Sequence, residues 1–341
     1  MIVLAHRPSH RRTLVKATGL AAAASLGLAA AVAGTLVPVI GGPVFAVVAG
    51  VLLSPLARRR SAALLPGLNL AKGLILQLSV VFLGAQLSLN EVLSASAASL
   101  PVMLGTLGVC LLLAWLVGRR LGVPPDLRTL IGVGTGICGA SAIAATTPAI
   151  RAKSNDVTYA ISTIFLFNLA AVLVFPPLGH ALQMNAHAFG LFAGTAINDT
   201  SSVVAAAGAH GQEAVEYAVV VKLARTLMII PIVLVLITLT RRRTDFRDTP
   251  KVRLAASLVP WFLVAFLAVA ALNTGGLIPA AAQAALHRMA LLFIAVALAA
   301  VGLSTDVPAL RRTGARPLLL GLILWAAVTL TSLGLQYLLT D

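Results

Sequence analysis

Residues 194–205 read GTAINDTSSVVA, and apolar sequence continues on both sides of this run. Its acid, Asp199, is the only carboxylate of the chain that lies well inside an apolar stretch. A carboxylate at membrane depth is costly and is therefore a functional candidate. Gly, Thr and Ser let helices pack closely, or let a helix break so that its exposed backbone groups bind ions. The run therefore predicts either a close helix contact or a discontinuous helix that forms a site around Asp199.

A similar run occurs sixty residues earlier, where residues 134–145 read GTGICGASAIAA. Five of the twelve aligned positions are identical, although chance similarity in a chain rich in Ala, Gly and Leu is the alternative explanation. We predict that both runs are broken helices that meet near the middle of the membrane. The residues predicted to bind substrate or ion in the two runs are Gly134, Thr135, Gly136, Cys138, Gly139, Ser141, Gly194, Thr195, Asn198, Asp199, Thr200 and Ser201.

Two cations, Lys222 and Arg225, complete the predicted site. Their i, i+3 spacing places both on one face of a helix, deep in an apolar window, and we expect them to pair with Asp199. Two cations beside one acid leave a positive charge that a transported anion neutralises, and the planar Arg fork suits oxyanions. The alternative is a structural role, in which the cations only hold Asp199 or anchor a helix end.

The composition of the whole chain is that of a membrane protein. Of 341 residues, 59% are hydrophobic and 10% are charged, whereas about 25% of the residues of a soluble domain are charged. Eleven apolar windows are near the length that spans a bilayer, and they lie at 14–34, 36–56, 64–88, 97–118, 129–150, 157–179, 186–209, 214–240, 254–273, 286–305 and 315–339. We predict an all-α polytopic membrane protein with about 10–11 transmembrane segments, two of them discontinuous or re-entrant.

Basic residues predict the orientation. Clusters at 58–60, 119–120, 241–253 and 311–316 fall on one side in an eleven-span count, and this side is cytoplasmic because Lys and Arg concentrate there. The N-terminus is then cytoplasmic, and the net charge of +15 reflects loop bias rather than nucleic-acid binding. Arg151 and Lys153 obey the rule only if 129–150 dips into the membrane and returns, with 186–209 dipping in from the other face. Two broken helices that cross fully are the alternative, and the sequence is compatible with both.

A second internal similarity has an offset of 216 residues. The run LSLN at 87–90 is matched by LSTD at 303–306, and by the charge argument these two turns lie on opposite sides. This relation indicates inverted repeats, as in many secondary transporters. We assign 1–35 to a cytoplasmic N-terminus and first span, and 36–341 to one transporter domain with repeats at about 64–179 and 186–341. Arg11-Arg12 also resembles a twin-Arg signal, so a removed first span is the alternative to a retained one.

Other polar residues fit structural roles. Lys72 and Arg288 lie near window ends, where we expect their side chains to snorkel to the interface. Asn168 is expected to form an interhelical hydrogen bond. Cys110 and Cys138 lie in apolar stretches and indicate neither a disulfide framework nor a thiolate metal site, and no cofactor is expected.

The two runs, together with VKLARTLMIIP at 221–231 and AVGLSTD at 300–306, resemble the YeiH-type family of bacterial inner-membrane proteins. The resemblance extends over nearly the whole chain from about residue 36. It implies inverted repeats, a core of discontinuous helices, and a place in a superfamily of cation:proton antiporters and anion transporters, with sulfate export as the proposed activity. Some members have His-Glu where this chain has Asn198-Asp199, so the carboxylate is kept but a proton relay through position 198 is not expected.

We expect a secondary active transporter of a small anion, such as sulfate or a related oxyanion or sulfonate, coupled to a proton or sodium gradient. A cation/proton antiporter and a passive anion channel are the alternatives of the same fold. An enzyme is not expected, because Asp199 has no acidic partner at depth, and the sequence contains no nucleotide-binding loop through which ATP would drive transport. The expected location is the bacterial cytoplasmic membrane, as a monomer or a homo-oligomer, with the anion and the bilayer as partners and no nucleic acid.

Overall fold

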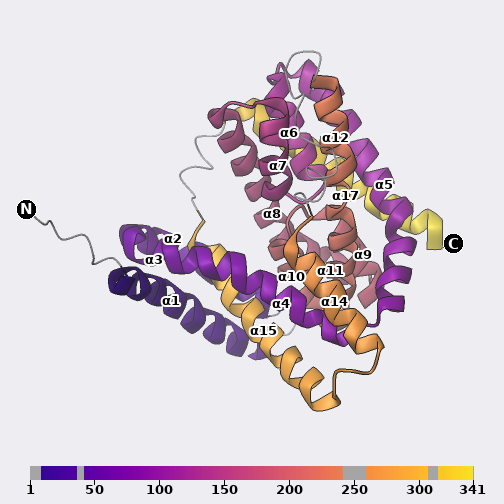
Figure 1. Ribbon diagram of the computed structural model, residues 1–341. Coiled ribbons are helices and arrows are strands. Elements are labelled where there is room, and N and C mark those ends of the chain that lie inside the picture. The colour runs from indigo at the N-terminus through magenta and orange to yellow at the C-terminus, as the bar shows by residue number, and fades with distance from the viewer. Residues whose placement is uncertain (1–8, 37–41, 241–258, 306–313, 341) are drawn as a thin grey trace, which may run out of the picture.

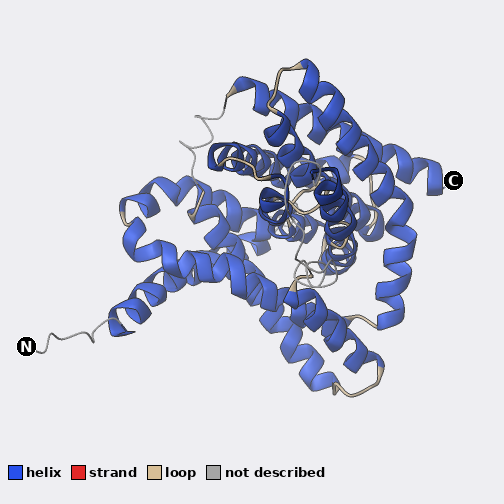
Figure 2. Cartoon of the chain, turned by 45° about the horizontal axis from the view of Figure 1, so that its top comes forward, coloured by secondary structure: helices blue, strands red, loops and turns tan. Residues whose placement is uncertain are grey.

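The computed structural model describes residues 9–36, 42–240, 259–305 and 314–340, and every regular element within them is a helix (Figure 2). The elements are α1 (Ser9–Leu36), α2 (Gly42–Arg59), α3 (Ser61–Leu70), the π-helical η1 (Ala71–Ile75), α4 (Leu76–Leu83), η2 (Gly84–Gln86), α5 (Leu89–Arg120), α6 (Pro125–Gly136), α7 (Ala140–Ile150), α8 (Ser154–Ala181), α9 (Ala186–Ala196), α10 (Thr200–Ala207), η3 (Gly208–His210), α11 (Gln212–Thr226), α12 (Ile229–Thr240), α14 (Trp261–Thr274), α15 (Ala280–Leu303) and α17 (Ala315–Thr340).

The helices confirm a polytopic all-α membrane protein. Seven segments in the described part are long and apolar enough to cross a membrane, and they are Gly42–Arg59, Ala63–Gln86, Leu89–Arg120, Ser154–Ala181, Gln212–Thr238, Ala280–Leu303 and Ala315–Leu339. Three shorter apolar helices are Ala17–Ala33, Ala140–Ile150 and Trp261–Thr274. Each of the eleven predicted windows coincides with one of these segments or with a pair of shorter helices. The 311–316 and 241–253 loops fall largely outside the described residues.

The helices form two layers (Figure 1). The first layer contains α1, α2, α3 and α15, which pack against one another, with α4 and α14 beside them. The second layer, which we name the bundle, contains α5 to α12 and α17. Small residues allow close contacts in the first layer: a Cβ placed on Gly302 would lie 2.4 Å from the main-chain oxygen of Val47, so α15 and α2 meet at backbone distance.

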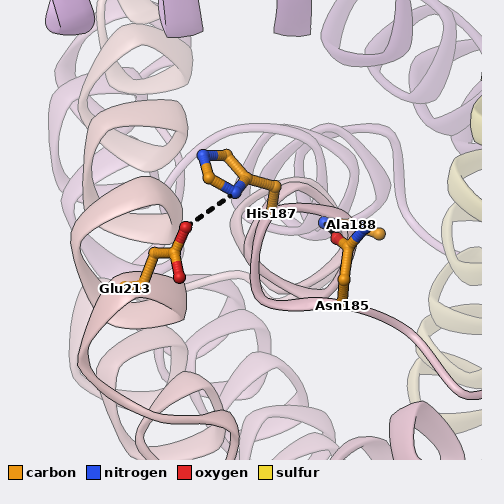
Figure 3. A network of polar contacts seen from close by, with 4 residues as sticks. All are labelled: Asn185, His187, Ala188 and Glu213. Atoms are coloured by element: carbon orange, nitrogen blue, oxygen red, sulfur yellow. Dashed lines mark hydrogen bonds and ion pairs between the residues drawn. The ribbon is translucent and has the colours of Figure 1, made fainter.

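The pair α9–α10 is a hairpin that enters the bundle and returns. His187 at the start of α9 pairs with Glu213 at the start of α11, with 3.0 Å between Nδ1 and Oε1, and Asn185 caps α9 by accepting from the Ala188 N–H (Figure 3). Further along, Gly194 of α9 packs on Val221 of α11, so the two helices run in the same direction. Because α11 follows directly after α10 and η3, α10 leads back to the end where α9 began. We name this end of the bundle the Glu213 end.

The pair α6–α7 is a hairpin from the opposite end. α5 begins at the Glu213 end, where Glu91 and Glu213 line one cavity, and finishes at Arg120, so α6 starts at what we name the Arg120 end. α8 finishes at the Glu213 end, where His180 stacks on His210 with 4.1 Å between ring centroids. α8 therefore begins at the Arg120 end, and α7 must return there. The sequence left open re-entrant hairpins or full crossings, and the structure has re-entrant hairpins. Arg151 and Lys153 therefore lie at the same end as the other basic loops.

The two Leu-Ser turns also lie at opposite ends. Leu87 and Ser88 precede α5 at the Glu213 end, whereas Leu303 and Ser304 finish α15 near Arg58, at the Arg120 end. This placement agrees with the predicted opposition of the turns. The inverted-repeat relation of the whole halves and the division at about residue 180 stay predictions.

Candidate functional site

The tips of the two hairpins meet inside the bundle. The first break lies at Ile137–Gly139, between α6 and α7, and the second at Ile197–Asp199, between α9 and α10. Gly139 has a φ of 69°, which L side chains rarely adopt, and a Cβ at this position would lie 3.3 Å from the Cβ of Asp199. Glycine at 139 therefore permits both the sharp turn and the close approach of the second tip. Both runs are broken as predicted, at Gly139 in the first and at Asn198 in the second, whereas the Gly and Thr positions 134–136 and 194–195 stay helical.

Lys222 and Arg225 of α11 hold the two tips together. The Lys222 Nζ donates to the main-chain oxygens of Ile137, at 3.0 Å, and Ile197, at 2.6 Å. The Arg225 guanidinium donates to the oxygens of Thr195 and Thr135, the latter at 3.2 Å. Both side chains are completely buried. The last carbonyls of a helix have no partner within it, so each cation satisfies one such carbonyl from each hairpin.

The predicted pairing of these cations with Asp199 is wrong. Neither Lys222 nor Arg225 forms an ion pair with Asp199, because both are directed to the carbonyl ends of α6 and α9. Those ends carry the negative pole of the helix dipole and attract cations. The sequence indicated a cluster of three charges, but the backbone of the breaks competes with the carboxylate for the two cations.

Asp199 is the N-cap of α10 and its carboxylate is fully hydrogen-bonded. Oδ1 accepts from the Ser202 N–H at 2.7 Å and from the Ser201 hydroxyl at 2.5 Å. Oδ2 accepts from the Ser202 hydroxyl at 2.9 Å and from the Asn168 amide. An ionised carboxylate offers about four acceptor positions. Four donors therefore surround Asp199, and a proton or a cation reaches it only when one of them turns away.

Asn168 forms the interhelical hydrogen bond that the sequence predicts, but the sequence pattern did not place it in the site. It lies on α8, is 3% exposed, and donates its amide to Asp199 while its Oδ1 accepts from the Asn198 N–H at 3.1 Å. One side chain thus fixes both the acid and the turn that precedes it. The available signal was an amide in the middle of the apolar run IFLFNLAAV, where a buried amide requires partners.

Two adjoining cavities open on the tips, between the bundle and the first layer. The first cavity, of about 400 Å³, is lined by Cys138, Ser141, Thr200 and Thr226 from the bundle and by Gln77 and Trp261 from the first layer. The second, of about 570 Å³, is lined by Asn168 and Ser162 from the bundle and by Ser304 and Thr305 from the first layer. The residues common to both are Lys72, Gly73, Ala140, Asp199 and Ser201. The N-terminal ends of α7 and α10 therefore face the space where the two cavities adjoin.

The predicted residues divide into two groups. Those that line the cavities are Cys138, Ser141, Asp199, Thr200 and Ser201. Those that lie in or behind the tips without lining either cavity are Gly134, Thr135, Gly136, Gly139, Gly194, Thr195, Asn198, Lys222 and Arg225. Within the second group, Thr195 shares a hydrogen bond of 2.7 Å with Ser332 of α17, which attaches the second tip to the bundle.

The formal charges and the helix-end dipoles at the tips do not cancel. A helix end corresponds to about half a charge, positive at the N-terminus and negative at the C-terminus. The C-terminal ends of α6 and α9 and the N-terminal ends of α7 and α10 thus offset one another, and Asp199 offsets one of the two cations. About one positive charge is left uncompensated among these groups.

Comparison with known proteins places the chain in a family. The family model described as "Conserved hypothetical protein 698" matches residues 18–321. A UPF0324 membrane protein of Fusobacterium nucleatum is 38% identical over 293 residues, which cover 80% of this chain and 84% of the relative. UPF0324 membrane proteins of Streptococcus pyogenes serotype M18 and Streptococcus pneumoniae R6 are 41% and 39% identical, each covering 82% of the relative and 79% and 80% of this chain.

No solved structure matches the chain. The extent of the family match and the identities near 40% show that the chain belongs to the UPF0324 family of membrane proteins, which is the YeiH-type family that its motifs resemble.

Proposed function

We propose that this member of the UPF0324 family is a secondary active transporter of a small anion. The observation that carries the proposal is the pair of buried cations, Lys222 and Arg225, which no acid contacts within the described part of the chain. Together with Asp199 and the four half-helix ends, they leave about one positive charge beside the cavities. An anion of one or two charges neutralises this site at the moment it binds. Sulfate, a related oxyanion or a sulfonate is the substrate class that fits.

The hairpin arrangement supports transport rather than static binding. Each tip is reached from one end of the bundle, and both N-terminal half-helix ends face the same region. A substrate bound between two such tips contacts an element from each side of the membrane. The second cavity extends from Asp199 to Ser304 and Thr305 at the Arg120 end, which the charge pattern predicts to be cytoplasmic. This cavity is a route by which the anion enters from that side.

Asp199 is our candidate for the coupling group. It is the acid that lines both cavities, and the hydroxyls of Ser201 and Ser202 rotate freely enough to change from donor to acceptor. A proton or sodium ion on Asp199 removes or offsets its negative charge, and the affinity of the region for an anion then rises. Cation and anion binding are coupled in this way without a direct contact between them.

The test is counterflow in proteoliposomes that contain the purified chain. Vesicles loaded with unlabelled anion take up the labelled anion from outside, with sulfate, phosphate and ethanesulfonate tested in turn and protein-free liposomes as the control. We expect saturable uptake of at least one anion, accelerated by the same anion inside. A cation/proton antiporter would move protons in response to sodium with no anion requirement. A passive channel would show uptake that does not depend on anion inside the vesicles.

A further inference from the structure

Lys72 occupies an unexpected position. The sequence places it near a window end, where a lysine snorkels, but it lies on η1, ten residues into the membrane-crossing segment Ala63–Gln86. Lys72 is exposed, and it lines both of the cavities that Asp199 lines. Lys72 therefore faces the hairpin tips from the first layer, and it is the cationic side chain that the two cavities share.

The backbone at Lys72 is also special. Residues 71–75 form a single π-helical turn, with the sequence AKGLI, inside an otherwise α-helical segment. Such turns are rare and occur frequently at functional sites. The extra residue of a π-turn rotates the following part of the helix by about 100° relative to a regular helix. The π-turn therefore sets the direction of Lys72 relative to the α-helical parts of the segment on either side.

Lys72 differs from the two deeper cations in what it contacts. Lys222 and Arg225 use their donors on main-chain carbonyls and line neither cavity. Lys72 forms no hydrogen bond or ion pair with any described residue, so all three N–H donors of its ammonium are free for another group. An anion in the cavities therefore meets Lys72 directly, whereas Lys222 and Arg225 act on it only through their field.

We infer that Lys72 is the residue that contacts the transported anion and sets its affinity, with Lys222 and Arg225 as positioning residues that join the tips. This inference rests on the proposed function. A lysine acts as a compact point charge and not as a planar fork. The site therefore selects for charge and size more than for oxyanion geometry. Chloride-like and tetrahedral anions compete with each other here, whereas an arginine fork would favour the tetrahedral oxyanions.

The first experiment measures concentration-dependent counterflow in proteoliposomes for the wild type, Lys72→Gln, Lys72→Arg and Arg288→Gln. Arg288 is the matched control, because it is an exposed cation of the same layer that lines neither cavity. We expect Lys72→Gln to raise the half-saturating anion concentration about tenfold or more, as for loss of a charge-assisted hydrogen bond. Lys72→Arg keeps the charge and should stay within about threefold. Unchanged half-saturation in a well-folded Lys72→Gln protein overturns the inference and leaves the proposed function intact.

The second experiment does not depend on transport. Trp261 lines the first cavity together with Lys72, so its fluorescence reports on ions there, in a Trp115→Phe/Trp325→Phe background. Iodide, caesium and acrylamide quench it as anion, cation and neutral probes. We expect Lys72→Gln to reduce iodide quenching and raise caesium quenching, with acrylamide quenching unchanged. If counterflow fails for every anion, the proposed function fails, and this experiment still judges Lys72: equal iodide quenching in both proteins refutes its role in attracting anions.

Discussion

Ile137 and Ile197, sixty positions apart in the chain, present their main-chain oxygens to the same ammonium group, that of Lys222, at 3.0 and 2.6 Å. Thr135 and Thr195 stand in the same relation to Arg225. The two hairpins that carry these residues come from opposite ends of the bundle. The two similar runs therefore make equivalent contacts with the same helix, α11. These contacts fix the two tips, and the tips in turn determine where the cavities and Asp199 lie.

Loss of the Lys222 ammonium should destabilise the protein. Lys222→Met fills a similar volume but leaves two buried carbonyls without a donor, and each unsatisfied group costs about 1–3 kcal/mol. We expect a clearly lower midpoint of thermal unfolding in detergent. Lys72→Met is the control, since that side chain bonds to no described residue and its loss should leave the midpoint nearly unchanged. Equal midpoints for Lys222→Met and wild type would show that the cation does not join the tips.

Gly139→Ala should impair function more than a glycine change elsewhere with the same φ. The Ala Cβ would crowd the Cβ of Asp199 at 3.3 Å, and a backbone with φ 69° and ψ −129° adds about 1–3 kcal/mol of strain. Gly276 also has a φ of 69° but has open space around it, so Gly276→Ala places a Cβ on a residue of positive φ without the crowding. We expect anion counterflow to be lost only in Gly139→Ala. Similar loss in both variants would point to backbone strain and not to the contact with Asp199.

Acid should destabilise the Glu213 end of the bundle through His210. Burial, and then the charge of His180 beside it, lower the pKa of His210 to about 4, and the ring stacks on Phe189. The unfolded chain takes up a proton near pH 6.5, while the folded chain resists it, so stability falls as the pH drops from about 6.5 to 4. His210→Phe keeps the stack but does not titrate. The unfolding midpoint of this variant should fall less over that range, and parallel pH profiles would contradict the assignment.

The hairpin topology predicts the accessibility of three loop positions. Cysteine at Arg120 or Lys153 should be protected from an impermeant thiol reagent outside intact cells, because both positions lie at the end predicted to be cytoplasmic. Cysteine at Leu182, which is exposed between α8 and α9, should react. The native Cys110 and Cys138 are buried and give a low background. Reaction at Lys153 with protection at Arg120 would mean that α6–α7 crosses the membrane.

Much of this architecture could be predicted from the sequence. Apolar windows of span length locate the helices, and the Gly, Thr and Asn positions of the two runs locate the breaks to within a few residues of Gly139 and Asn198. The loop charges at Arg151 and Lys153 raised the possibility of hairpins, but the sequence was equally compatible with full crossings. These features depend on local composition, which a single sequence contains.

The partners of each polar group could not be predicted in the same way. Asp199 bonds to Asn168 of α8 and not to Lys222, because the choice depends on how helices distant in sequence are rotated against each other. The carbonyls at the breaks belong to the main chain, so the side-chain pattern did not show that they would bind the two cations. The direction of the Lys72 side chain could not be predicted, because a π-turn rotates its helix face and the sequence AKGLI gives no sign of such a turn.

The most direct test of coupled anion transport through this site is the response of anion uptake to an imposed pH gradient in Asp199→Asn. Asparagine is an equally good N-cap, so α10 should keep its start while the charge is removed. The control is Asp156→Asn, an acid at the start of α8 that lines neither cavity. We predict that the pH gradient accelerates uptake in the wild type and in Asp156→Asn, whereas Asp199→Asn is inactive or takes up anion at a rate independent of the gradient. Gradient-driven uptake of wild-type size in Asp199→Asn would contradict the account.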